Sequence, residues 1–178
     1  MLRALKEQLM QLSTVDKDSF AEKIQAHISE HEAPAAINSL RNLILIMPDL
    51  IHQIRVWAND SRVPAKDKEL HGFILTYLYQ PVDFLPESEH GFFGYLDDAY
   101  FVGAVYISTM LHMDYGTRQF LQNLSGLENK VPEWLETARK VMPDEAEKID
   151  VLVKQLLEGK KEAFLHLMEQ ETSKSVSG

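Results

Sequence analysis

The sequence predicts an all-α fold, a helical bundle of eight or nine helices around a buried central helix at about residues 95–113. Three observations support this prediction. Apolar residues recur at helical spacing along almost the whole chain. No Asn-Gly or Asp-Gly hairpin turn and no sustained alternation of apolar and polar residues occurs. The run AYFVGAVYISTML, which begins at Ala99, contains no charged residue, so its helix needs neighbours on every side.

Two amphipathic helices are predicted in the first 30 residues. Residues 2–12 form the first helix, and the second runs to about residue 30. Asp16 and the two hydroxyl side chains at Ser13 and Thr14 are expected to cap the second helix. A side-chain oxygen at that position accepts a hydrogen bond from a free N–H group of the first turn.

Prolines divide the next part of the chain into separate predicted helices. A third helix begins at Pro34 and is expected to stop before Pro48, because a proline inside a helix removes a backbone hydrogen bond. The aspartate after Pro48 suits the positive end of a new helix dipole, which predicts a helix at 48–58. A polar turn and a helix at 65–79 follow, and Pro81 ends that helix.

The C-terminal third returns to amphipathic helices that should pack around the central one. Four are expected: 115–124, 132–141, 143–157 and 161–171. Gly103 in the central helix should let a neighbouring helix approach closely. Residues 172–178 are small and polar and predict a disordered tail, which leaves 1–171 as a single helical domain.

Composition limits the classes of function. The chain has no cysteine, which excludes disulfides and thiolate chemistry. A net charge of −9 argues against nucleic acid as a partner, and the same acids would repel an anionic membrane surface. Nucleophile-elbow, phosphate-loop and dinucleotide-binding motifs are missing, which argues against an enzyme of those classes. The N-terminus alternates charge with leucine and predicts a cytoplasmic protein.

The stretch QPVDFLPESEHGFFGYLDD, residues 80–98, differs from the plain helical pattern around it. Pro81 and Pro86 fix the backbone and predict a stiff loop. Gly91 and Gly94 permit backbone angles that other residues avoid, and predict a tight turn just before the central helix. This combination of loop and turn is the part of the chain on which a functional prediction can rest.

The acids in and around this stretch have two interpretations. Residues 69–117 contain seven carboxylates and neither lysine nor arginine. Asp97 and Asp98 fall in the first helical turn, where the dipole stabilises them, and Asp83 between two prolines typically binds backbone N–H groups. Since consecutive helix positions point about 100° apart, one aspartate of the pair can brace the preceding loop while the other faces solvent or a site.

The second interpretation is a divalent-cation site, although no cofactor is otherwise expected. Carboxylate oxygens are ligands for Mg²⁺, Mn²⁺ or Ca²⁺, and histidines would suit zinc or iron. The candidate metal ligands are Asp83, Glu87, His90, Asp97 and Asp98. His71 lies nearby in sequence, but it has no second candidate ligand at helical spacing, which favours a hydrogen-bonded structural histidine or a surface histidine over a metal ligand.

The order of these residues resembles the YkvA-like domain of unknown function family. In that family a helix ends in Y-x-x-x-P-x-D-x-I/L-P-D, a turn G-x-x-D-D follows, and an apolar helix comes next. Here the three parts read YLYQPVDFLPES, GYLDD and AYFVGAVY, within about residues 66–110. The signature positions are Pro81, Asp83, Pro86, Gly94, Asp97 and Asp98. Glu87 departs from the family pattern, which commonly has aspartate there.

This resemblance implies a small helical domain, found in bacteria and in some larger eukaryotic proteins, and implies no particular reaction. The segments 1–60 and 115–171 lie outside it and are expected to be flanking packing helices. We expect a helical protein-interaction or regulatory module, with 80–98 as its working surface, rather than an enzyme. The alternative is a divalent-metal-binding protein or metal-dependent enzyme that uses the carboxylates at 83–98.

Aromatic side chains beside exposed turns are typical of protein-binding surfaces. The candidates for contact with a protein partner are Phe84, Phe92, Phe93 and Tyr95. Core packing is the alternative interpretation, and we expect it to hold for at least half of them. A homodimer is compatible with the N-terminal amphipathic helix, although nothing in the sequence fixes the oligomeric state.

Overall fold

The structure, a computed structural model, describes residues 2–78, 85, 87–114, 116–118, 126–162 and 164–165; Glu87 and Ser88 are described by their backbone alone. This part of the chain is all-α, as predicted. Its elements are α1 (Leu2–Val15), α2 (Lys17–Gln25), α3 (Ala33–Ala58), α4 (Ala65–Tyr77), α5 (Glu87–His90), the 3-10 helix η1 (Gly91–Tyr95), α6 (Leu96–His112), α8 (Leu127–Val141) and α9 (Pro143–Leu157). The helices predicted at 115–124 and 161–171 lie largely outside the described residues, and the tail lies wholly outside them.

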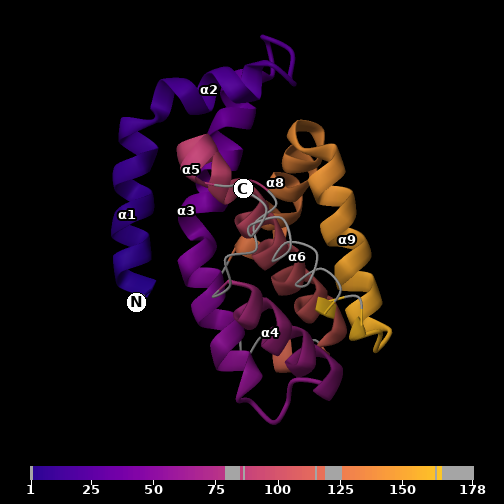
Figure 1. The fold of residues 1–178 in the computed structure, drawn as a ribbon. Helices are drawn as coiled ribbons and strands as arrows, with labels where there is room; N and C mark the ends of the chain where they lie inside the picture. Colours follow the sequence, from indigo (N-terminus) through magenta and orange to yellow (C-terminus); the bar gives the residue numbers. More distant parts are fainter. Residues whose placement is uncertain are drawn as a thin grey trace.

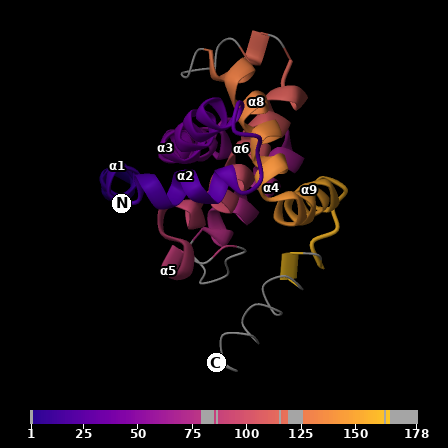
Figure 2. The same ribbon diagram turned by 90° about the horizontal axis from the view of Figure 1, so that it is seen from above.

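Helix α6 occupies the centre of the bundle, as the uncharged run predicted. Eleven of its 17 residues are buried, including Tyr100, Phe101 and Tyr106. Helices α3, α4, α8 and α9 all contact it, and Figures 1 and 2 show it between α3 on one side and α8 and α9 on the other. A helix that is apolar all round is stable only in such surroundings.

Helices α1 and α2 form an elbow on the outside of α3. Helix α1 lies along α3, and α2 crosses the end at which α3 begins (Figure 1). The core extends into this elbow through the buried side chains of Leu9, Phe20 and Ile24. One continuous cluster of buried apolar residues therefore extends from α1 to α9.

The separate helix predicted at 48–58 is wrong, because α3 runs for 26 residues straight through Pro48. A proline in a helix interior costs about 3 kcal/mol. Met47, Leu50 and Ile51 beside it are at most 5% exposed, and burying each contributes about 1.5–3 kcal/mol. The burial of these three side chains contributes more free energy than the proline costs, so the helix continues.

Helix α8 likewise begins earlier than the proline at which it was expected to start. Gly126, with φ of 86°, turns the chain into a helix that begins at Leu127 and contains Pro132. Val131, in the turn before the proline, is fully buried. The helix expected at 143–157 has the bounds that the sequence predicted.

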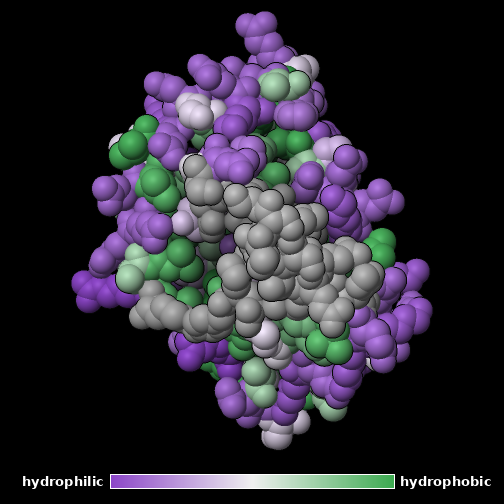
Figure 3. Space-filling model, viewed as in Figure 1, coloured by the Kyte–Doolittle hydropathy of each residue, from purple (hydrophilic) through white to green (hydrophobic). Residues whose placement is uncertain are grey.

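Hydrophilic residues dominate the face of the molecule that is coloured in Figure 3. Hydrophobic side chains show there in separate patches, several of them on the left of the view, where α1 and α3 lie. No helix among the described residues combines the length and the hydrophobicity that crossing a bilayer requires.

The close helix approach predicted at Gly103 is confirmed. A Cβ atom at this position would lie 3.0 Å from Leu135 Cδ2 and 3.4 Å from Val131 Cγ1, both on α8, and 3.5 Å from Leu43 Cδ1 on α3. We expect Gly103→Leu to lower the free energy of unfolding by about 1–3 kcal/mol, because the added side chain has no space. Urea unfolding followed by circular dichroism measures this change.

Gly72 on α4 provides the matched control for this substitution. It is exposed, and a Cβ atom there meets no other atom within 4 Å. Gly72→Leu should raise the free energy of unfolding by about 0.5–1 kcal/mol through helix propensity alone. Equal effects at the two glycines would contradict the close packing of α6 against α8.

Candidate functional site

Part of the 80–98 stretch is described, and it leads into the central helix through two short helices. The predicted residues Pro81, Asp83, Phe84 and Pro86 lie outside the described residues, as does the side chain of Glu87. Gly91 has φ of 61°, which is the tight turn that the sequence predicts. Gly94 has no positive φ; it is buried within the 3-10 helix η1 instead.

The turn at Gly91 is held by an aspartate from the elbow between α1 and α2. Asp16 Oδ2 accepts a hydrogen bond of 2.9 Å from the backbone N–H of Phe92, and a Cβ atom at Gly91 would collide with this carboxylate. Asp16 makes no side-chain cap on α2, so the predicted cap is wrong. Helix α2 also ends at Gln25 instead of about residue 30. Asp16 was expected to act within its own helix, but its carboxylate binds a backbone N–H group 76 residues further along the chain.

The aromatic residues of this segment belong to the core. Three of the four candidates for partner contact, Phe92, Phe93 and Tyr95, have side chains that are at most 8% exposed. For these three the core-packing interpretation holds. Phe20 of α2 packs edge-on against Phe92, with ring centroids 5.0 Å apart, and Lys23 Nζ lies 5.7 Å from the centre of the Phe93 ring. Phe92 and Phe93 attach the segment to α2 and offer little surface to a partner.

Asp97 and Asp98 lie in the first turn of α6 and have different surroundings. Asp97 is fully buried, and its Oδ2 accepts a hydrogen bond of 3.2 Å from the backbone N–H of Leu85. Asp98 is partly exposed and lines a surface groove. One carboxylate thus binds the backbone of Leu85 while its neighbour lines the groove, as the angle between consecutive helix positions allows.

The predicted metal site is described only in part. His90 Nδ1 lies 3.4 Å from Lys23 Nζ, which places a positive charge where a cation would have to bind. No group of three His, Asp or Glu residues within the described ranges is arranged to hold a metal ion. Because the side chains of Asp83 and Glu87 are not among those described, the metal site stays a prediction.

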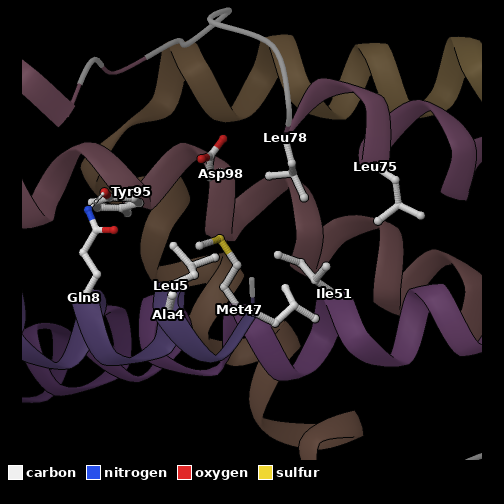
Figure 4. A pocket seen from close by; sticks show the side chains of 10 residues that line it. Ala4, Leu5, Gln8, Met47, Ile51, Leu75, Leu78, Tyr95 and Asp98 are labelled. Carbon is white, nitrogen blue, oxygen red and sulfur yellow. Dashed lines mark hydrogen bonds between the residues drawn. The ribbon is translucent and has the colours of Figure 1, made fainter.

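The groove beside Asp98 has a volume of about 400 Å³ and lies between α1, α3, α4 and the start of α6. Its apolar lining residues are Leu2, Ala4, Leu5, Met47, Ile51, Leu75 and Leu78. In Figure 4 several of these side chains point toward one another, and Gln8 meets Tyr95 at one end. The Gln8 amide donates a 2.9 Å hydrogen bond to the Tyr95 hydroxyl. The result is an apolar groove with polar groups at one end.

A line of buried polar side chains between α4 and α6 was not predicted. Asp67 is fully buried, and its Oδ1 lies 2.7 Å from His112 Nδ1. The signal in the sequence was the placement of Thr109 and His112 near the end of an otherwise apolar helix.

His71 lies one turn from Asp67 on α4 and is also fully buried. Thr109 donates its hydroxyl proton to the Val105 carbonyl at 3.0 Å, so its oxygen accepts the proton of His71 Nε2 at 2.8 Å. The structural role expected for His71 is confirmed. Burial lowers the pKa of this imidazole to about 4, and the positive charge of Lys68 adds to the effect.

Comparison with protein-family models, with curated proteins and with solved structures finds no match to this chain. The likeness to the YkvA-like family therefore stays a prediction from the sequence. The function must be argued from the groove and the residues around it.

Asp97 provides a test of the brace. We expect Asp97→Asn to lower the free energy of unfolding by about 1–3 kcal/mol, because it weakens a buried charge-assisted hydrogen bond to the Leu85 N–H group. Asp98→Asn, at a partly exposed position, should change it by less than about 0.5 kcal/mol. Urea unfolding of both variants measures the difference, and a larger loss in Asp98→Asn would contradict this assignment.

His71 should make stability depend on pH between about 6.5 and 4. The unfolded chain binds a proton on this ring below its ordinary pKa, whereas the folded chain does so only near pH 4. The free energy of unfolding therefore falls as pH falls, by up to about 3 kcal/mol from this group. In His71→Gln we expect that part of the loss to disappear.

The measurement is urea unfolding at several pH values for wild type and variants. His52→Gln removes one histidine from an exposed position on α3 and serves as the control. Parallel pH profiles for wild type and His71→Gln would show that burial of His71 does not couple folding to protonation.

Proposed function

We propose that this protein is a helical interaction module that binds a basic, amphipathic segment of a partner protein in the groove between α1, α3 and α4. The observation that supports this proposal is the groove itself. Partly exposed leucines from α1 and α4 line it together with Met47 and Ile51 of α3. The carboxylate of Asp98 lies at its edge. This combination suits a partner that presents apolar side chains on one face and positive charge beside them.

The apolar part of the groove provides affinity. Leu2 and Leu5 on α1 and Leu75 and Leu78 at the end of α4 keep part of their surface in water. Covering such surface contributes about 25 cal/mol per Å² of apolar area. An amphipathic helix achieves this by laying side chains spaced one turn apart into a groove formed by other helices.

The charge of the chain provides selectivity. Asp98 lies at the groove, in a region of sequence, 69–117, that has seven carboxylates and neither lysine nor arginine. With a net charge of −9, the protein attracts a basic segment and repels an acidic one. The 80–98 stretch thus contributes Tyr95 and Asp98 to the proposed surface, while its other described aromatic residues support the core.

A synthetic peptide tests the groove. The probe is a fluorescent helical peptide of about 14 residues, built from leucine and lysine with the leucines on one face. We expect it to bind wild type, and we expect Ala4→Trp to weaken binding at least about tenfold, because Ala4 is exposed and lines the groove. Fluorescence anisotropy gives the dissociation constants.

Met10→Trp is the matched control, since it adds the same side chain to an exposed position of α1 that does not line the groove. It should bind the peptide as wild type does. Asp98→Asn should weaken binding, and a peptide with glutamate in place of lysine should not bind. Equal binding by Ala4→Trp and Met10→Trp, or by a scrambled peptide, would overturn the proposal, as would self-association of wild type through this groove in sedimentation measurements.

A further inference from the structure

A second cavity lies on the other side of α1, in the elbow where α1 and α2 meet above α3. It has a volume of about 340 Å³, which is within the range of small-molecule sites. Its lining residues are Ser13, Thr14, Lys17, Phe20, Ile37 and Arg41. They come from the end of α1, the start of α2 and the first half of α3.

Arg41 is the central polar group of this cavity. The side chain is half-buried, and Nη2 donates a hydrogen bond of 3.2 Å to Ser13 Oγ. Ser13 Oγ itself donates to the Met10 carbonyl at 2.8 Å, so the serine is already paired in both directions. Within the described part of the chain Arg41 forms no ion pair. A partly desolvated guanidinium with donors left over is suited to binding an oxyanion.

Lys17 adds a second positive charge, and none of the described side chains that line the cavity is acidic. This is a local reversal in a chain with 27 acids and 18 lysines and arginines. Lys17 is also the first residue of α2, a helix of nine residues that has no side-chain cap at its N-terminus.

We propose that the elbow cavity binds a small molecule that carries a phosphate group and an apolar body. The planar guanidinium of Arg41 matches two phosphate oxygens, and the Lys17 ammonium neutralises the remaining charge. Phe20 and Ile37 form the apolar side of the cavity and contact the body of the ligand. A carboxylate, with a single negative charge, would balance only one of the two cations. This inference does not depend on the groove on the other side of α1.

Three probes define the ligand class: phenyl phosphate, inorganic phosphate and benzoate, each titrated into ¹⁵N-labelled protein at low salt. We expect phenyl phosphate to cause saturable shifts of backbone amide signals at residues 13–20 and 37–41. Inorganic phosphate lacks the apolar body, and benzoate has a single negative charge, so both should bind at least about tenfold more weakly. Equal affinity for benzoate, or shifts confined to other residues, would overturn the proposal.

Substitution of Arg41 tests the site directly. We expect Arg41→Gln to weaken phenyl phosphate binding at least about tenfold. Arg55→Gln is the matched control, because it makes the same change of charge at an exposed position of the same helix, and it should bind as wild type does. Lys17→Gln, at an exposed position, gives a second variant should Arg41→Gln fail to fold, and it should also bind more weakly. Unchanged binding in the folded cavity variants would refute the site.

Discussion

Helix α6 has no charged side chain from Ala99 to Leu111, so most of its surface must be kept away from water. Two of its polar side chains bond to different neighbouring helices. Tyr100 donates its hydroxyl to Asp150 of α9 at 2.8 Å, and Thr109 accepts from His71 of α4. Since an unpaired polar atom in the core costs more than a paired one contributes, these bonds fix how the surrounding helices are placed along α6.

Two aspartates, Asp16 and Asp97, bind backbone N–H groups that are distant in the sequence. Asp16 accepts from Phe92 at the start of η1, and Asp97 accepts from Leu85, two residues before α5. These two carboxylates accept from N–H groups that lie outside regular hydrogen bonding, which allows a chain segment without long helices to pack against α1 and α2. Asp98, one residue further on, is left at the surface beside the groove.

The sequence predicted those features that depend on local spacing. An uncharged run identified α6, the position of Gly103 in it indicated close packing, and the first turn of the helix placed Asp97 and Asp98. The features that it missed depend on distant residues. Pro48 stays inside α3 because neighbouring side chains are buried by helices elsewhere in the chain, and Asp16 is bound by a segment that the sequence order does not bring near it.

Both cavities were beyond sequence reasoning for the same reason. The groove needs α1, α3, α4 and α6, and the elbow cavity needs α1, α2 and α3, so each exists only once helices separated in sequence are packed together. The charge and the aromatic residues of 80–98 directed the functional prediction to a segment of which Tyr95 and Asp98 line the groove. The sequence of this stretch did not distinguish the side chains that build the core from those that reach the surface of the molecule.

The central position of α6 also has a consequence for synthesis on the ribosome. Two of its neighbours, α3 and α4, precede it in the chain, whereas α8 and α9 are translated later. In the emerging chain α3 and α4 can cover one apolar side of α6. The side that packs against α8 and α9 stays in water until residue 157 has left the exit tunnel. During that interval the uncovered side is a surface for chaperones or for other nascent chains, and the order of the helices makes this exposure unavoidable.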